Sequence, residues 1–271
     1  MNSINQIEVI YHNRLVGRLA LTKDNLCAFE YSAEWQNSGF SISPFELPLR
    51  SGVFIAKSRP FDGGFGVFDD CLPDGWGLLI LDRYLQQNGI NPRALSLLDR
   101  LALVGSTGRG ALEFRPDKSV TSEQDYSDFE ELALEAERIL SSDDYAGKGI
   151  DEFQYRGGSP GGARPKIFTR HENKEWLVKF RAKHDPKNIG ALEYEYSLLA
   201  KKCGIEMPET RLFEDKYFGV ERFDRIKDEK LHVVSIAGLI GADYRLPSID
   251  YYHIFQICTA LTHNIAELWK V

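Results

Sequence analysis

The sequence predicts an α+β fold, and three patterns along the chain lead to that prediction. Apolar and polar residues alternate near the N-terminus, at Ile7, Val9 and Tyr11, which is typical of antiparallel strands. Apolar residues recur with helical spacing over 128–142 and through most of 235–271. Between these segments, a glycine-rich stretch at 155–168 leads into further predicted strands. The chain therefore combines small sheets with amphipathic helices.

Length and composition limit the number of domains and the kinds of partner that this chain can have. The chain has 271 residues and is 43% hydrophobic, which is enough apolar material for a packed core in about two folding units. Its net charge of -7 argues against a protein whose main task is to grip a nucleic acid backbone. A partner that binds DNA on its behalf remains compatible with this charge.

Cysteine usage and the N-terminus point to the cytoplasm. Four scattered cysteines, none in a C-x-x-C pair, predict reduced thiols and neither disulfides nor structural zinc; they are Cys27, Cys71, Cys203 and Cys258. The N-terminus resembles neither a signal peptide nor an anchor, and no stretch approaches the roughly 20 apolar residues of a membrane span. We therefore expect a cytoplasmic protein without membrane contact.

The first predicted domain covers residues 1–116. His12 and Asn13 form a turn between the first two strands, Gly89 ends the first helix, and Pro92 begins the second. In chain order the predicted elements are strands at 7–11, 14–21 and 26–31, an irregular region at 39–70, helices at 74–89 and 92–103, and a strand at 111–116.

The second predicted domain covers residues 117–271 and begins with a polar linker. A second break separates its first helix from the glycine-rich stretch, and Gly204 ends its second helix. In chain order the predicted elements are a linker at 117–127, a helix at 128–142, a break at 142–149, strands at 164–170 and 175–181 joined by a turn at 171–174, a helix at 189–203, strands at 209–214 and 217–223, and a mostly helical tail at 235–271.

The glycine-rich stretch contains the segment GGSPGGARPK, directly before a predicted hairpin. Its glycines expose backbone N–H groups that can wrap phosphate oxygens, and Lys166 adds a positive charge. The segment is not a Walker A motif, because no G-K-[ST] ends it. A flexible loop that needs positive φ angles is the alternative interpretation.

Three further signals follow the loop in the order of a kinase N-lobe. Lys179 lies on a predicted strand and could neutralise phosphates, although an exposed strand lysine is the alternative. The next helix carries Glu193 and Glu195 on different sides, so at most one can orient that lysine; either could instead be favoured by the helix dipole. The strand at 217–223 ends in a charged turn or in a hinge that contacts a nucleotide.

Together these segments resemble the HipA family of bacterial toxin serine/threonine kinases. The resemblance rests on GGSPGGARPKIF, WLVKF, EYEYSLLAKKCGIEMPETRLF, YFGVERFDR and LHVVSIAGLI in order, and on ISPFELPLR and LPDGW in the first unit. It implies a truncated HipA-like kinase fold with a mixed N-terminal subdomain, a kinase-like N-lobe and the start of a helical C-lobe. It also implies a kinase that uses ATP and Mg²⁺ to phosphorylate a protein, as family members do with aminoacyl-tRNA synthetases.

The resemblance assigns roles residue by residue. Lys179 would pair with the ATP phosphates, Glu193 would support it, and Glu221 and Phe223 would contact adenine through the backbone. From its place in the hinge after the strand at 217–223, Asp224 could reach a ribose hydroxyl. Ser159 matches a serine that such kinases autophosphorylate, where a phosphate would expel ATP. The implied ATP-binding residues are Gly158, Ser159, Gly161, Gly162, Ala163, Lys166, Lys179, Glu221, Phe223 and Asp224.

The sequence departs from the family where chemistry is expected. After Lys179, no Asp has an Asn five residues later and no D-F-G occurs, so no catalytic residue or metal ligand is assigned. His263-Asn264 is not read as a substitute, and the helical pattern runs to the last residue. We therefore expect a chain that lacks the catalytic segment and is inactive alone.

Three interpretations stay open at this point. The chain is part of a kinase whose catalytic half lies elsewhere, a non-catalytic nucleotide-binding protein, or a module that binds an antitoxin or a companion kinase chain. The family implies a helix-turn-helix antitoxin as partner, with DNA contacted only through it. The apolar tail also predicts a dimer or association with the missing half.

Overall fold

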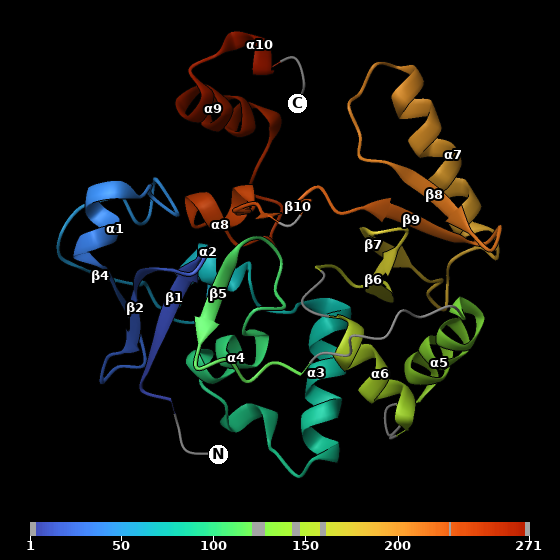
Figure 1. Cartoon of the computed structure of the whole chain (residues 1–271), viewed down its shortest axis with the longest axis horizontal. Helices are drawn as coiled ribbons and strands as arrows, with labels where there is room; N and C mark the ends of the chain where they lie inside the picture. Colours follow the sequence, from blue (N-terminus) through green and yellow to red (C-terminus); the bar gives the residue numbers. More distant parts are fainter. Residues whose placement is uncertain (1–3, 121–127, 143–146, 158–160, 228, 269–271) are drawn as a thin grey trace.

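The first sheet begins with a hairpin near the N-terminus (Figure 1). The computed structural model describes residues 4–120, 128–142, 147–157, 161–227 and 229–268. β1 (Gln6–Tyr11) and β2 (Arg14–Leu21) are joined by His12 and Asn13, with φ angles of 46° and 61°. Two consecutive positive φ angles are characteristic of the type I′ turn, which matches the twist of the strands it connects. The three strands predicted here are confirmed.

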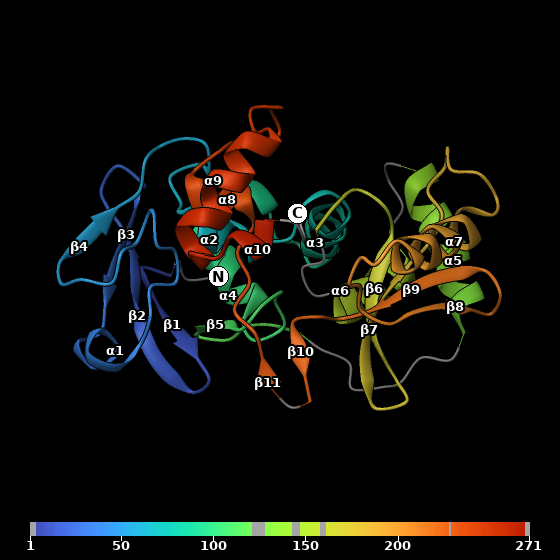
Figure 2. The same cartoon turned by 90° about the horizontal axis from the view of Figure 1, so that it is seen from above.

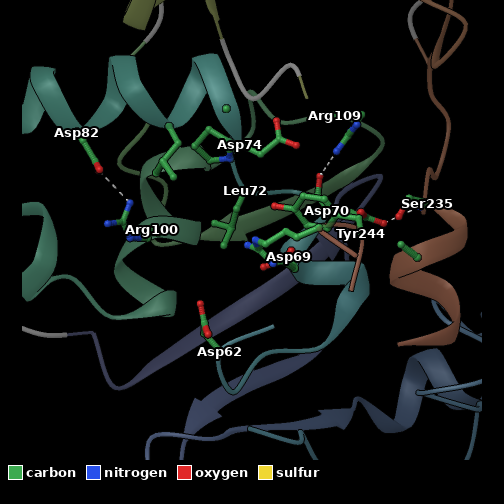
Figure 3. Close-up of a pocket in the computed structure, with 15 residues that line it drawn as sticks. Asp62, Asp69, Asp70, Leu72, Asp74, Asp82, Arg100, Arg109, Ser235 and Tyr244 are labelled. Atoms are coloured by element: carbon green, nitrogen blue, oxygen red, sulfur yellow. Dashed lines mark hydrogen bonds and ion pairs between the residues drawn. The ribbon is translucent and has the colours of Figure 1, made fainter. Parts of the chain in front are cut away.

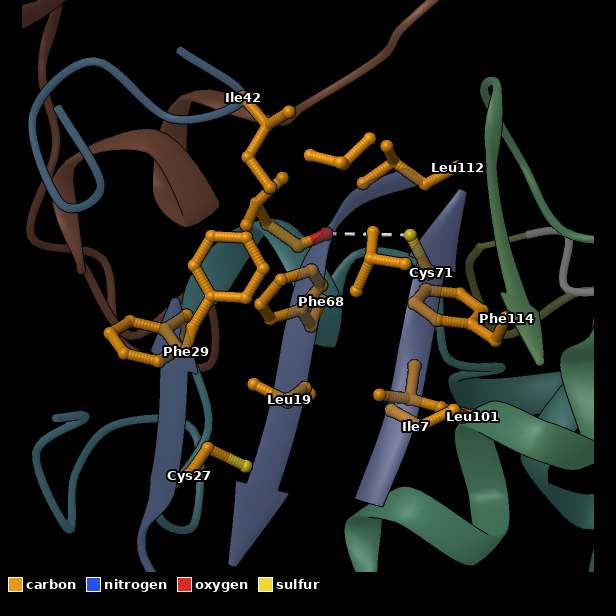
Figure 4. Close-up of a cluster of buried hydrophobic side chains, with 14 of the residues drawn as sticks. Ile7, Leu19, Cys27, Phe29, Ile42, Phe68, Cys71, Leu101, Leu112 and Phe114 are labelled. Carbon is orange, nitrogen blue, oxygen red and sulfur yellow. Dashed lines mark hydrogen bonds between the residues drawn. The ribbon is translucent and has the colours of Figure 1, made fainter. Parts of the chain in front are cut away.

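Five antiparallel strands complete this sheet in the order β4-β3-β2-β1-β5. β3 (Cys27–Tyr31), β4 (Val53–Ile55) and β5 (Leu112–Arg115) join the hairpin, and α1 (Ala33–Ser38) follows β3. Short α2 (Gly66–Asp69) and α4 (Leu97–Val104) contribute apolar side chains to the same core. Figure 4 shows that core, in which Phe29, Phe68 and Phe114 are fully buried.

Helix α3 (Gly75–Gln87) lies between the two sheets in both views of the chain (Figures 1 and 2). Its Trp76 and Ile80 are buried in the second hydrophobic core, where the Trp76 ring meets Phe153 edge to face at 5.0 Å. A helix from the first part of the chain therefore completes the core of the second part.

The second sheet has four antiparallel strands in the order β6-β7-β9-β8. They are β6 (Lys166–His171), β7 (Lys174–Lys179), β8 (Thr210–Phe213) and β9 (Tyr217–Glu221). Side chains alternate along β7, so that Trp176 and Val178 enter the core shared with α5 (Phe129–Ser141) and α6 (Lys148–Gly157). Lys179 points to the opposite face, where α7 (Ile189–Lys202) packs on β8 and β9.

The chain then returns to the first part of the molecule. The hairpin of β10 (Arg225–Ile226) and β11 (Glu229–Lys230) leads to α8 (Ile236–Ile240), which packs against α2. A Cβ atom placed on Gly66 would lie 2.1 Å from the Gly238 carbonyl oxygen, so the two helices meet backbone to backbone. α9 (Tyr251–Thr262) and α10 (Ile265–Leu268) follow.

Four predicted segments differ in the structure. The irregular region at 39–70 contains β4 and α2, and α6 occupies residues that were assigned to a break and to the start of the glycine loop. The helix predicted at 92–103 is a 3₁₀ turn at Pro92–Ala94 followed by α4, because Leu95 is extended and Ser96 begins a new capped helix. The tail is interrupted at 241–250 and at His263, which ends α9 with a φ of 50°.

Candidate functional site

An ion pair joins the second sheet to the helix that covers it. Lys179 Nζ lies 2.8 Å from Glu193 Oε2, and also 5.2 Å from the centre of the Phe218 ring. Glu195, two residues further along α7, is exposed. Of the two glutamates that the sequence left open, the structure therefore pairs Glu193 with Lys179.

The position of α7 depends on a close backbone approach at its first turn. A Cβ atom on Gly190 would lie 2.1 Å from the carbonyl oxygen of Lys216, in the turn before β9. Only glycine permits this contact, which brings the helix, and with it Glu193, against the sheet. The sequence carries a weak signal for this constraint, a glycine in the first turn of an otherwise regular helix.

A second lysine lies beside Lys179, on the neighbouring strand of the sheet. Lys166 on β6 is the register partner of Lys179 on β7, and it is only 5% exposed. Burial, together with the charge of Lys179, lowers the pKa of Lys166 to about 8, although Asp74 and Glu193 act in the opposite direction. Its Nζ donates a hydrogen bond to the carbonyl oxygen of Gly161 at 2.5 Å.

The described part of the glycine loop begins at Gly161. Gly162 has a φ of +97°, a backbone conformation that favours glycine, and a Cβ atom there would lie 2.8 Å from Lys166 Nζ. Ala163 is exposed. The predicted phosphate contacts of Gly158 and Ser159, and the predicted phosphorylation of Ser159, lie outside the described residues.

The glycine loop rests on the N-terminus of α3. The Gly162 N–H donates to Asp74 Oδ1 at 2.6 Å, and the Gly162 carbonyl accepts from the Trp76 N–H at 3.1 Å. Asp74 was not among the predicted site residues. Its only signals in the sequence are the helix start and the LPDGW segment that resembles the family.

The predicted hinge residues are separate from the lysines. Glu221 lies opposite Trp176 on β7, three residues from Lys179; its N–H donates to the Glu209 carbonyl and its carboxylate pairs with Lys174 at 2.9 Å. Phe223 is 63% exposed. Their backbone contacts with adenine stay predictions, and the N–H of Glu221 already has a partner.

Asp224 is a buried junction between the two parts of the chain, 4% exposed. It accepts hydrogen bonds from Arg222 and Arg225, and also from the Gly110 N–H at 2.8 Å in the first part. Burial opposes ionisation, but the bonds and charge of Arg222, with Gly110 and Arg225, outweigh it and lower the pKa of Asp224. These bonds give the carboxylate partners within the chain, and its contact with a ribose stays a prediction.

A cavity of about 630 Å³ opens beside the loop, between α2, α3 and the segment around α8 (Figure 3). Its lining is rich in aspartates and arginines; Asp82 pairs with Arg100 at 3.3 Å, and Arg109 Nη2 donates to the Asp70 carbonyl at 2.8 Å. Asp74 both lines this cavity and bonds the glycine loop. The cavity therefore adjoins the loop through Asp74.

The residues present fit a phosphate group better than a metal ion. Lys166 and Lys179 lie side by side next to a glycine-rich backbone, which is the donor set that phosphates prefer. Among the described residues, no group of three His, Cys, Asp or Glu side chains is placed to hold a metal ion. No helix within the residues that the structure describes is long and apolar enough to cross a membrane.

Two family models match the chain in sequence. The HipA N-terminal domain matches residues 7–115, and the HipA-like C-terminal domain matches residues 158–271. The chain belongs to the HipA-like family. None of the curated proteins compared with this HipA-like chain matches it.

A solved structure shares the fold of this HipA-like chain. It is the complex of HipA, HipB and operator DNA from a toxin–antitoxin system of Shewanella oneidensis MR-1, with a TM-score of 0.61 and 20% sequence identity. The match covers 93% of this chain but 64% of the matched chain. The predicted α+β, HipA-like kinase fold is thus confirmed, and the chain spans less than two thirds of its structural relative.

Proposed function

We propose that this HipA-like chain binds ATP between its glycine loop and the Lys166–Lys179 pair, as the nucleotide-binding part of a serine/threonine kinase of a toxin–antitoxin system. The observation that carries the proposal is the 2.8 Å ion pair of Lys179 and Glu193. Kinases use a glutamate from a packed helix to orient a strand lysine toward the α- and β-phosphates. Lys166 supports the same reading, since it adds a second cation across the sheet.

Phosphoryl transfer is not part of the proposed activity of this chain alone. Transfer requires an aspartate that accepts the hydroxyl proton, and further side chains that hold magnesium. The sequence after Lys179 contains no Asp followed five residues later by Asn. We therefore expect binding of the nucleotide without turnover.

Calorimetric titration with Mg-ATP tests the proposal through two matched pairs of variants. Lys179→Ala should abolish binding, while Lys183→Ala, which removes the same charge from an exposed site, should not. Glu193→Gln should weaken binding because Lys179 loses its ion pair, while Glu195→Gln on the exposed side of α7 should not. Unchanged affinity in Lys179→Ala would contradict the proposed site.

Mass spectrometry of the same samples tests the second part of the proposal. Incubation with Mg-ATP should leave Ser159 unmodified, because the chain supplies no catalytic aspartate. Phosphate on Ser159 after incubation of the purified chain would show that the chain carries out the transfer itself. A full-length relative added in trans provides the positive control.

A partner-binding function is the second candidate, and the exposed apolar side chains of α9 and α10 favour it. Tyr251 and Tyr252 are 67% and 65% exposed, and Phe255, Leu261 and Ile265 are exposed as well. Apolar patches of this kind commonly mark protein interaction sites. We propose a helix-turn-helix antitoxin as a partner, with operator DNA contacted only through it, as HipA and HipB occur together in the Shewanella complex. Light scattering of the chain alone, and with such an antitoxin, tests this; a monomer in both samples would contradict it.

A further inference from the structure

Asp74 occupies the N-cap position of α3 but does not cap that helix. Its side chain accepts no hydrogen bond from the first turn of α3. Instead, Oδ1 accepts the N–H of Gly162, which lies 88 residues further along the chain. Asp is favoured at N-cap positions because its carboxylate satisfies N–H groups of its own helix. Here that capacity is directed to the glycine loop.

A second hydrogen bond holds the same residue of the loop. The carbonyl of Gly162 accepts the N–H of Trp76, a donor at the start of α3 that has no partner within the helix. Gly162 thus donates to one residue of the helix start and accepts from another. A single contact would leave the loop free to rotate, whereas two contacts define its orientation.

The two backbones meet closely enough to require glycine at the start of α3. Gly75 has a φ of +44°, and a Cβ atom there would lie 2.7 Å from the carbonyl oxygen of Gly162 and 2.9 Å from the Cα of Ala163. At the neighbouring position, a Cβ atom on Gly161 would lie 2.9 Å from Nη1 of Arg109. Both Gly75 and Arg109 belong to the first part of the chain, so that part shapes the described end of the loop.

The charge of Asp74 also acts on the lysine beneath the loop. Asp74 raises the pKa of Lys166 against the larger lowering effect of burial, and Lys166 donates to the Gly161 carbonyl. The loop is therefore held between a carboxylate of the first part and an ammonium group of the second sheet. Removal of the carboxylate releases the Gly162 N–H and also destabilises the protonated form of Lys166.

We propose that Asp74 is a positioning residue for nucleotide binding: it docks the glycine loop on α3, so that the N-terminal part of the chain sets the loop conformation that receives phosphate. The inference rests on the proposed function, since it assigns a purpose to the docked loop. The docking itself is a separate and measurable property. The contacts of Gly162 fix the described end of the loop without a bound nucleotide, which reduces the entropy that binding must overcome there.

Hydrogen exchange and calorimetry on three variants of the full chain test the proposal. In Asp74→Ala, the Gly162 amide should lose its protection, and the Kd for Mg-ATP should rise about tenfold, the size expected for loss of one charge-assisted hydrogen bond. Asp74→Asn keeps an oxygen acceptor at the same place, so it should keep most of the protection of the Gly162 amide and most of the affinity for Mg-ATP. Asp82→Ala is the matched control, because Asp82 lies on the same helix but pairs with Arg100. It should change neither the protection of the Gly162 amide nor the Kd for Mg-ATP.

The outcomes separate the two proposals. Unchanged protection of Gly162 in Asp74→Ala overturns the docking role, and so does tighter binding of Mg-ATP, which would make the carboxylate a competitor of phosphate. If the unmodified chain binds no Mg-ATP, the proposed function fails, and the exchange data alone still decide whether Asp74 docks the loop. Asp74→Ala removes no bond within α3, and equal melting temperatures of the variants would show that the fold is retained.

Discussion

Replacement of Asp224 by alanine should destabilise the fold far more than the loss of an exposed carboxylate. The carboxylate of Asp224 accepts bonds from Arg222 Nε at 3.0 Å, and from Arg222 Nη2 and Arg225 Nη1, both at 2.8 Å. The two arginine side chains are only 5% and 9% exposed. Alanine would leave two buried guanidinium groups without their main counter-charge, and would also remove the acceptor of the Gly110 N–H.

Removal of one partner from a buried ion pair costs about 3–5 kcal/mol. Glu175 remains within 3.3 Å of Arg222 and 3.5 Å of Arg225, but its side chain is 45% exposed, so it compensates only in part. We therefore expect a loss of about 3 kcal/mol for Asp224→Ala. Asp224→Asn, which keeps one oxygen acceptor, should lose less.

Urea unfolding followed by tryptophan fluorescence measures this loss. With a slope of about 3 kcal/mol per molar urea, a loss of about 3 kcal/mol lowers the midpoint by about 1 M. Asp24→Ala, which removes a carboxylate from an exposed turn, is the matched control and should leave the midpoint unchanged. Equal midpoints for the two variants would refute the argument that the buried junction stabilises the fold.

The same junction predicts a pH dependence. The pKa of Asp224 is lowered in the folded chain, so its stabilising effect is complete above its ordinary pKa of about 3.9 and is lost as the pH falls through the folded value. Below about pH 4 the unmodified chain should therefore approach the stability of Asp224→Ala. A constant difference between the two down to pH 2 would contradict the lowered pKa.

Three further predictions concern the pH dependence of stability, a close backbone contact and the reactivity of cysteines. The pKa of Lys166 is lowered to about 8 in the folded chain, so between about pH 8 and pH 10.4 the unfolded chain binds more protons than the folded chain. Urea midpoints of the unmodified chain should therefore rise over this range, whereas those of Lys166→Met should not. Gly190→Ala should cost about 1–3 kcal/mol in the same assay, because its Cβ atom would meet a backbone carbonyl at 2.1 Å. A thiol reagent should label exposed Cys203 in the folded chain but spare Cys27 and Cys71, in which burial raises the pKa to about 12; rapid labelling of either would contradict their burial.

Regular local patterns made most of the fold predictable from sequence. Alternation and turn residues predicted the hairpin at His12-Asn13, and helical spacing predicted α5. The elements that were missed are short or lack periodicity. β4 has three residues and α2 four, and both are held by contacts distant in sequence, such as the approach of Gly66 to Gly238.

The candidate site was predictable only where one segment carries the signal. The order of glycine loop, Lys179 and helix glutamate is visible in the sequence, so the Lys179–Glu193 pair could be anticipated. Asp74 could not, because it precedes the loop by 88 residues and only the fold brings the two together. The ribose contact of Asp224 stays a prediction, but its burial against Arg222 and Arg225 could not be predicted from the sequence, because it depends on the fold.

The place of α3, which belongs to the first part of the chain but packs in the core of the second, limits how this molecule can be divided or recombined. A break after residue 116 would separate Trp76 and Ile80 from the side chains that cover them, including Phe153. The first fragment would keep its own core but expose Trp76 and Ile80, and the second would lack the part of its core that these side chains fill. Grafting the first 116 residues of a distant relative onto the remainder would place a foreign helix against Phe153 and Trp176. Chimeras between family members should therefore keep α3 together with the sheet it covers, whatever the origin of the strands that precede it.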